Sequence, residues 1–424
     1  MTTSTELYKK RIAVTALQPG MFVCELDRPW SETPFLFQGF PLLSEDDVLA
    51  VQLHCEYVFI DESRAISVGK TSRLSLVPLE GETDTGGRYN PTPQVSLAEE
   101  AEHAGFVHAH GKAVVEKVFN DILSGHAIRV QDCRLLVRQC VSSLVRNENA
   151  LIWFSRLKSR DEYTALHCLS VSVLAAGFSR YLGHSKEEVE EIGLAGLLHD
   201  VGKIKLDQQI LNKPDRLTSS EYEHVKQHAA LGYELLSAQS VGSWPTIAAR
   251  SHHERLDGRG YPQGIAAEEI PYIARLIAVV DCYDAITSHR VYDAARSTNR
   301  AFRILMEERG GHFDAELVEK FIEWIGVYPV GSIVELQTGE IGVVVAVNAK
   351  ARLKPAIVLV RDEAQQPCEP RYIDMNVQRD RNGQSYRIRE SHPNLSFGID
   401  IQQYERQGLF TPRYLTAPPT TATG

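Results

Sequence analysis

The sequence predicts a multidomain protein with a small N-terminal α+β unit, a central all-α bundle and a short C-terminal β unit. Three observations lead to this fold class. The chain of 424 residues is longer than a single hydrophobic core normally supports. Apolar residues recur with helical spacing over residues 96–328. Short apolar runs bounded by turn residues precede and follow that region, as is typical of strands.

Composition and charge are those of an ordinary globular protein, with 43% hydrophobic and 24% charged residues. The net charge of −10 offers no basic surface, so we expect no nucleic acid polymer as a partner. The segment from Met1 to Arg11 lacks the apolar stretch of a signal peptide, and we find no apolar run long enough for a membrane span. The seven cysteines are scattered and form no CxxC, which favours a reducing, cytoplasmic location.

Residues 1–70 are predicted to form the N-terminal α+β domain. The runs RIAVTAL, GMFVCEL, FLFQGF and EYVFID read as strands, and SEDDVLAVQLH reads as a helix. The stretch LDRPWSETPFLFQGF is rich in aromatic residues and proline, which indicates a packed loop and strand or a surface that receives a signal or partner. Residues 71–95 are poor in large apolar residues and rich in Gly, Pro and Thr, so they are predicted to be a linker.

The helical domain is predicted over residues 96–328. Ser96 and Glu99 have the spacing of a capping box at its first helix. His108 and His110 are two residues apart and face different sides of that helix, so we interpret them as packed or solvated side chains.

The region after the helical domain is predicted to be rich in strands. Residues 329–410 contain the strand-like runs SIVELQTG, EIGVVVAVN and PAIVLVRD, which predict a small β unit. Residues 411–424 lack core-forming side chains and are predicted to be a disordered tail. The sequence does not indicate what this β unit does.

Polar clusters within the apolar helical segments are the candidate functional residues. They are HDVGK beginning at His199, a later His228, the pair His252 and His253, and Asp281 in AVVD. Charged groups beside apolar helices are costly unless they are paired or bound to metal. Imidazoles and carboxylates without thiolates are typical of sites for divalent metals that support hydrolysis.

Adjacent His199 and Asp200 constrain the local geometry. On a regular helix they project about 100° apart, so both reach one cavity only if it holds more than one ion or if the helix is distorted. Gly202 permits such a distortion. Asp200 is then placed to bridge two cations, which would clamp a bridging hydroxide and phosphate oxygens. Lys203 lies one helical step from Asp200 and could hold a phosphate oxygen or the metal-bound water.

The segments HDVGKI, KQHAALG, HHERLDGRGYP and AVVDCYDAITSHRVY resemble the HD-GYP family of HD phosphohydrolases, from about Tyr163 to Trp324. The resemblance implies an HD-type helical bundle with a two- or three-metal centre that hydrolyses the bacterial messenger cyclic di-GMP to pGpG, GMP or both. It implies Lys203 and Arg290 as contacts to the substrate phosphates. It also implies these metal ligands: His167, His199, Asp200, His228, His252, His253 and Asp281. The N-terminal stretch from Lys9 is similar to a domain of unknown function that is often fused ahead of HD-GYP modules.

Two positions depart from the pattern of the family. Some members carry a glutamate one helical turn before the histidine equivalent to His167, and it supports a third metal; here the residue is Tyr163. We therefore expect two divalent metal ions, with iron or manganese favoured by the His and carboxylate set. Asp293 stands where relatives often carry a basic residue, and an acid there would repel a substrate phosphate.

The loop with Gly260, Tyr261 and Pro262 is predicted to be a turn that walls the substrate pocket, and these three residues are candidate substrate-binding residues. Tyr261 has three roles open to it, which are stacking on a base, packing against the helices and docking a partner.

The resulting hypothesis is an enzyme in which Asp200 and Lys203 are catalytic, and a metal-bridging hydroxide attacks phosphorus. One alternative is a catalytically weak HD-GYP signalling module that binds the nucleotide or partner proteins such as GGDEF-type cyclases. Another is an HD hydrolase of a different phosphate ester. A homodimer is one of the oligomeric states that the sequence leaves open.

Overall fold

The structure is a computed structural model, and it describes residues 9–28, 40–42, 48, 51–52, 55–62, 93–157, 163–211, 213, 215–288, 297–348 and 351–406. Two compact units divide the chain, Met1–Thr85 and Gly86–Gly424. The predicted succession of an α+β unit, a helical bundle and a β unit is confirmed.

The N-terminal unit contains a four-stranded antiparallel sheet in the order β1-β4-β2-β3. Its strands are β1 (Lys9–Ala13), β2 (Phe22–Leu26), β3 (Phe40–Pro41) and β4 (Tyr57–Asp61). The run RIAVTAL is only half strand, because a 3₁₀ turn replaces the strand at Val14–Ala16. Of the predicted helix SEDDVLAVQLH, residues 48, 51 and 52 are helical, and the others lie outside the described residues, as does most of the predicted linker.

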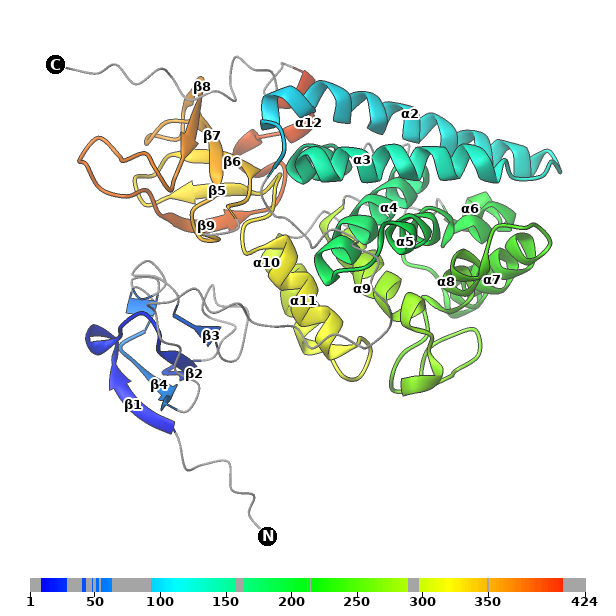
Figure 1. Ribbon diagram of the computed structural model, residues 1–424, viewed down its shortest axis with the longest axis horizontal. Helices are drawn as coiled ribbons and strands as arrows, with labels where there is room; N and C mark the ends of the chain where they lie inside the picture. The colour runs from blue at the N-terminus through cyan, green and yellow to red at the C-terminus, as the bar shows by residue number, and fades with distance from the viewer. Residues whose placement is uncertain are drawn as a thin grey trace, which may run out of the picture. The chain divides into compact units, whose positions relative to one another are not determined.

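The second unit contains a helical bundle (Figure 1). Its helices are α2 (Leu97–Leu123), α3 (Val130–Ser155), α4 (Tyr163–Leu182), α5 (Lys186–Leu198), α6 (Gln208–Leu211), α7 (Ser219–Ser237), α8 (Ser243–Ser251), α9 (Tyr272–Thr287), α10 (Thr298–Glu307) and α11 (Ala315–Ile325). Capping boxes at Ser96, Ser185 and Thr218 start α2, α5 and α7, and the first confirms the predicted Ser96–Glu99 pair. Each box satisfies amide groups that the first helical turn leaves without an internal partner.

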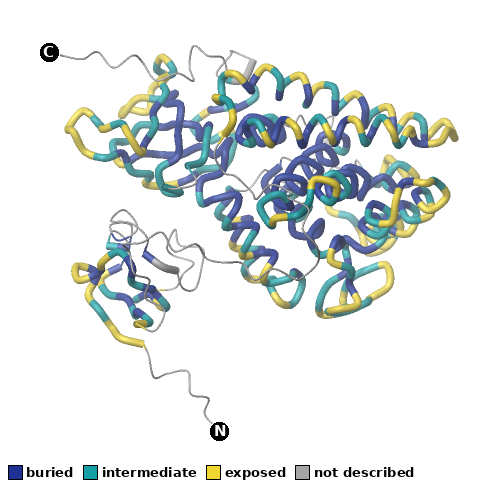
Figure 2. The backbone as a smooth tube through the Cα atoms, in the orientation of Figure 1, coloured by how far each residue is buried: buried dark blue, intermediate teal, exposed yellow. Residues whose placement is uncertain are grey.

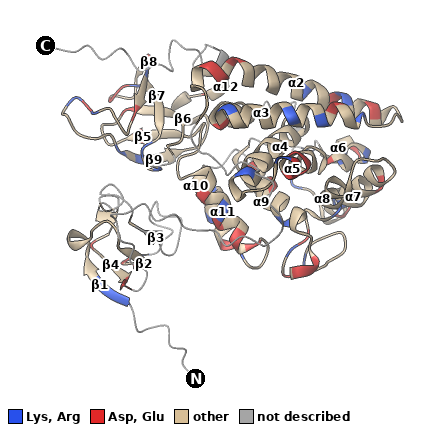
Figure 3. Cartoon of the chain, in the orientation of Figure 1, with Lys and Arg blue, Asp and Glu red and all other residues tan. Residues whose placement is uncertain are grey.

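Helix α4 is the buried centre of the bundle, packed against α3, α5 and α9 (Figure 2). Its segment Thr164–Leu182 is long and apolar enough to cross a membrane, contrary to the expectation from the sequence. However, 83% of this window is buried inside the protein. The apolar composition of α4 is therefore explained by its position as a core helix. Helices α2, α3 and α11 differ from it, because Lys, Arg, Asp and Glu are intermixed along them (Figure 3).

The C-terminal sheet is antiparallel and has the order β8-β7-β6-β5-β9. The strands are β5 (Ile333–Leu336), β6 (Ile341–Ala346), β7 (Ala356–Arg361), β8 (Pro367–Asp374) and β9 (Ile388–His392), and a short helix α12 (Ile401–Arg406) follows. The three predicted strands are β5, β6 and β7, and they are almost completely buried. Sequence analysis missed β8 and β9, which are partly exposed edge strands with a weaker apolar signal.

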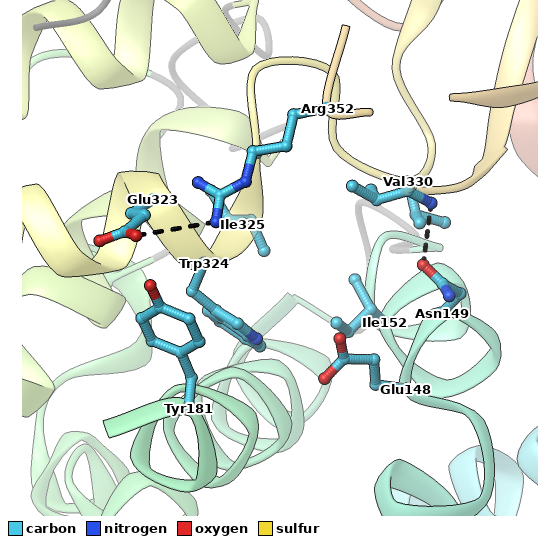
Figure 4. A pocket seen from close by; sticks show the side chains of 11 residues that line it. Glu148, Asn149, Ile152, Tyr181, Glu323, Trp324, Ile325, Val330 and Arg352 are labelled. Carbon is cyan, nitrogen blue, oxygen red and sulfur yellow. Dashed lines mark hydrogen bonds and ion pairs between the residues drawn. The ribbon is translucent and has the colours of Figure 1, made fainter. Parts of the chain in front are cut away.

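Side chains of the bundle and the sheet meet around a cavity of about 250 Å³ (Figure 4). Asn149 of α3 accepts a hydrogen bond from the Val347 amide at 3.1 Å. Glu323 of α11 lies 3.7 Å from Arg352, measured from carboxylate oxygen to guanidinium nitrogen. Trp324 forms part of the cavity wall. These contacts join the β unit to the bundle through polar groups as well as apolar packing.

Gly202, in the HDVGK motif, lies in close contact with the backbone of α7. A Cβ atom at this position would overlap the His228 carbonyl oxygen and lie 2.5 Å from the Gly232 amide nitrogen of α7. Both atoms belong to the backbone of a helix, so displacing them would disrupt the close packing around that helix. Gly202 therefore serves close packing against α7, and its backbone does not adopt the left-handed conformation.

We predict that Gly202→Ala lowers the free energy of unfolding by about 1–3 kcal/mol, because it overpacks the contact with α7. Chemical denaturation followed by circular dichroism measures the change. Gly311→Ala is the matched control, since its Cβ would meet no atom closer than 4.0 Å. Equal stability of the two variants would contradict the packing role of Gly202.

Candidate metal centre

The structure brings all seven predicted ligands together in two groups. One group is Asp200, His228, His252 and His253, and the other is His167, His199 and Asp281. Within each group, one ligand atom from every residue lies within 4.8 Å of the others. The residues come from α4, α7 and α9 and from the ends of α5 and α8, so five helices meet at this point.

A distortion of the helix at His199 and Asp200, one of the two alternatives left open by the sequence, is present. Helix α5 ends at Leu198, His199 caps it, and a 3₁₀ turn begins at Val201. Asp200 has φ −100° and ψ 8°, which is outside the helical range. This change of direction lets both side chains face the same centre, with His199 Nε2 3.3 Å from Asp200 Oδ2.

The two oxygens of Asp200 face different histidines. Oδ2 lies 3.5 Å from His167 Nε2 and 3.3 Å from His199 Nε2. Oδ1 lies 3.4 Å from His228 Nε2 and 3.7 Å from His252 Nε2. The carboxylate is buried between the two groups, in the position of a bridging ligand.

Backbone carbonyl groups set the orientation of three imidazoles. The Nδ1 atoms of His199, His228 and His252 lie 2.7–2.8 Å from the carbonyl oxygens of residues 196, 225 and 248, respectively. A carbonyl oxygen can only accept a hydrogen bond, so Nδ1 carries the proton and the lone pair of Nε2 points into the centre. Nε2 of His228 and Nε2 of His252 are 3.5 Å apart. The lone pairs of these two nitrogens would repel each other at this distance unless a cation lies near both.

Asp284 is a buried residue of the centre that sequence analysis missed. Its Oδ2 atom accepts a hydrogen bond from Nδ1 of His167 at 2.7 Å. The bond directs Nε2 of His167 toward Asp281, whose Oδ1 is 3.0 Å away. The sequence signal was the spacing of VVDCYD, which puts Asp284 one helical turn after Asp281. A carboxylate behind a histidine is a common arrangement in metal sites.

The electrostatics of the centre favour an ionised Asp200 and neutral imidazoles at His228 and His253. Burial acts to raise the pKa of Asp200, but Lys203 and His199 outweigh it and hold this pKa well below its usual range. Burial lowers the pKa of His228 to about 3, and burial with the neighbouring histidines lowers that of His253 as well. Around His167, burial is outweighed by hydrogen bonds to three carboxylates, which raise its pKa to about 9. The three carboxylates thus favour a positive charge at this place, either on His167 or on a bound cation.

Buried atoms without partners show that the residues fit a bound metal. Nε2 of His199 and Oδ1 of Asp200 are buried, and neither has a hydrogen-bond partner among the described residues. Leaving such atoms unsatisfied costs about 1–3 kcal/mol each, and metal coordination removes that cost. Histidine nitrogen and carboxylate oxygen are suitable donors for first-row divalent cations.

Comparison with known protein families covers all three parts of the chain. Residues 140–317 match an HD domain, residues 9–133 match a domain of unknown function (DUF3391), and residues 333–381 match a KOW domain associated with the HD domain. The second match runs past residue 70, through the predicted linker and along α2, so the domain boundaries stay predictions.

A relative from Pseudomonas aeruginosa, cyclic di-GMP phosphodiesterase PA4108, is 37% identical over 89% of this chain and 91% of its own length. This chain belongs to the HD-GYP family. A second relative, the cyclic di-GMP phosphodiesterase response regulator RpfG from Xanthomonas campestris, is 39% identical over 39% of this chain and 44% of its own length. A 3'3'-cGAMP-specific phosphodiesterase 1 from Vibrio cholerae is 31% identical over 45% of this chain and 44% of its own.

The loop that gives the HD-GYP family its name packs directly on the centre. A Cβ on Gly260 would overlap the Arg255 amide and lie 2.6 Å from the His253 carbonyl oxygen, so only glycine fits. The Tyr261 ring stacks on the His253 ring, with centroids 4.7 Å apart and planes at 29°. Its amide donates to the His253 carbonyl at 3.2 Å. Of the three roles considered for Tyr261, packing against the site is the one visible in these contacts.

Three residues used in the sequence analysis lie beyond what the structure describes. Arg290 and Asp293 are outside the described residues, and the side chain of Tyr163 at the start of α4 is also outside them. His110, which was predicted to be packed or solvated, belongs to neither ligand group, and its Nδ1 lies 3.0 Å from Gln139 Oε1 on α3.

We predict that Asp284→Ala weakens metal binding by about 10–100-fold, because His167 loses the hydrogen bond that orients it. Competition with a chelator of known affinity, followed by elemental analysis, gives the apparent affinity. Asp284→Asn keeps an acceptor at the same place and is expected to fall between Asp284→Ala and the wild type. An unchanged affinity in a correctly folded Asp284→Ala protein would show that His167 needs no orienting partner.

Proposed function

We propose that this protein is a metal-dependent phosphodiesterase that hydrolyses cyclic di-GMP to pGpG, GMP or both. The observation that carries the proposal is the buried Asp200 carboxylate, whose two oxygens face two separate groups of histidines. The relationship to a cyclic di-GMP phosphodiesterase over most of both chains supports the substrate.

The seven residues of the two groups would hold two divalent cations, and iron and manganese suit these ligands best. When bound, such cations supply an activated water nucleophile at neutral pH and a Lewis acid for the phosphate oxygens. Two ions rather than three follow from Tyr163 in place of a carboxylate.

Lys203 is the residue of this chain best placed to act on the substrate phosphate. Its ammonium group hydrogen-bonds to Asp200 Oδ2, and its side chain keeps part of its surface exposed. It thereby orients the carboxylate and places a positive charge at the edge of the centre, where negative charge develops on the phosphate. Tyr261, Gly260 and Pro262 form a wall beside His253, and Arg290 is proposed as a further phosphate contact.

We place the enzyme in the cytoplasm, because its seven cysteines are scattered along the chain and form no CxxC. GGDEF-type cyclases and a second copy of the chain are proposed partners. A second candidate substrate is 3'3'-cGAMP, which the 31% identity to a phosphodiesterase specific for it favours. A catalytically weak signalling module and a hydrolase of another phosphate ester remain the alternatives, and product analysis separates them.

We predict that Asp200→Ala abolishes hydrolysis of cyclic di-GMP, because the two cation positions lose their shared ligand. Chromatography of the reaction products measures activity, elemental analysis measures bound metal, and circular dichroism checks the fold. Asp215→Ala replaces an exposed aspartate of the same region and is expected to keep full activity. Undiminished turnover by Asp200→Ala would contradict the assignment.

We predict that removal of metal by a chelator lowers the melting temperature of the wild-type protein. A cation present at a hundred times its Kd stabilises the folded state by ~2.7 kcal/mol. Thermal unfolding with and without the chelator tests this, and added manganese should restore the melting temperature. The Asp200→Ala variant should respond much less, so an equal response of both proteins would mean that the stabilising ion binds elsewhere.

A further inference from the structure

Two residues of the metal centre reach solvent. Among its seven residues, His253 and Asp281 are partly exposed, and the other five are buried. These two side chains, with the partly exposed Lys203 beside Asp200, mark where a phosphate can approach the centre. Tyr261 stacks on His253 and so forms part of the rim of this opening.

Two residues of α7 extend the rim beyond Tyr261. The Lys226 ammonium nitrogen lies 5.7 Å from the centroid of the Tyr261 ring and 5.5 Å from that of the Tyr222 ring. Lys226 thus lies near aromatic rings from two separate parts of the chain. Tyr222 and Lys226 are one helical turn apart on α7, which also carries the candidate ligand His228.

These two side chains are available to a ligand. Tyr222 is 50% exposed, which leaves a large aromatic surface in water. Lys226 forms an ion pair with Glu223 at 2.6 Å, but the Glu223 side chain is 66% exposed. Such an exposed pair contributes little stability, so Lys226 can exchange this partner for a phosphate at small cost.

We propose that Tyr222 and Lys226 form, together with Tyr261, a nucleotide subsite in which Tyr222 stacks on a purine base and Lys226 contacts a phosphate oxygen. This inference rests on the proposed function, and it names residues that bind the substrate outside the metal centre. A cyclic dinucleotide has two phosphates and two bases, and only the scissile phosphate can occupy the centre. The remainder of the ligand needs flat aromatic surface and positive charge, which this rim supplies.

Steady-state kinetics on cyclic di-GMP tests the subsite. Tyr222→Ala should raise KM about tenfold, which corresponds to ~1.4 kcal/mol, with kcat changed less than twofold. Tyr222→Phe keeps the ring and should retain the wild-type KM. Lys226→Met should raise KM severalfold and weaken its dependence on salt, because an ionic contact is lost.

Controls separate this role from a general effect on the enzyme. Tyr272→Ala removes another exposed tyrosine, on α9, and Lys320→Met removes a lysine on α11 that is paired with Glu323 at 3.1 Å. Neither should change KM. Hydrolysis of bis(p-nitrophenyl) phosphate, a small diester without a base, should be unaffected by Tyr222→Ala and Lys226→Met. A loss of this activity, or wild-type KM values for cyclic di-GMP, would overturn the subsite.

Binding measurements distinguish failure of the subsite from failure of the proposed function. Calorimetry with cyclic di-GMP on the full chain carrying Asp200→Ala should show a Kd that rises about tenfold when Tyr222→Ala is added. If the wild type binds in a Tyr222-dependent way but does not hydrolyse the nucleotide, the subsite stands and the phosphodiesterase assignment falls. If hydrolysis proceeds and Tyr222→Ala leaves the Kd unchanged, the assignment stands and the subsite falls. Absence of both binding and hydrolysis by the metal-loaded wild type refutes both.

Discussion

The placement of two carboxylates, the buried Asp200 and the partly exposed Asp281, among five histidines is the constraint on which the rest of the bundle depends. Charged groups removed from water destabilise a fold unless opposite charges or cations lie beside them. Lys203 supplies one such charge, and the candidate metal ions supply the rest. The ends of α5 and α8, the first turns of α4 and the middle of α7 and α9 converge on this point, and each contributes at least one ligand atom.

Helix geometry itself orients most of the imidazoles. His199, His228 and His252 each bond through Nδ1 to a carbonyl group three or four residues earlier in the chain. Such a bond is local, and it leaves Nε2 free for an ion whatever the neighbouring helices do. His167 differs, because its Nδ1 bonds to Asp284 on another helix. Its orientation therefore depends on the packing of α4 against α9.

The GYP loop is held from two sides. On one side, Gly260 and Tyr261 pack on His253. On the other, the amide of Asp257 donates to the Gly311 carbonyl at 2.7 Å, and Arg255 forms an ion pair with Glu308 at 3.2 Å. The turn between α10 and α11 thus holds the loop over the partly exposed edge of the centre. A rigid rim is what a binding subsite requires, because mobile groups would lose entropy when a ligand binds.

The sequence by itself determined the helical class of the bundle, and its resemblance to the HD-GYP family indicated the seven residues that meet at the candidate centre. The motifs are local, and the helical spacing of apolar residues is enough to place each one on a buried segment. The adjacency of His199 and Asp200 also required either a distorted helix or a cavity with more than one ion, and the 3₁₀ turn after Asp200 provides the distortion. These features depend only on neighbours in the chain.

Other features were decided by tertiary packing. The division of the ligands into two groups, the contact of Asp284 with His167 and the approach of Lys226 to Tyr261 all join distant parts of the chain. Gly202 was predicted to allow backbone distortion, but its close contact with α7 is what requires glycine. The edge strands β8 and β9 escaped prediction because partial exposure weakens their apolar pattern. Spacing in the sequence reports which face of an element a residue occupies, whereas distances between elements are set by how their side chains pack.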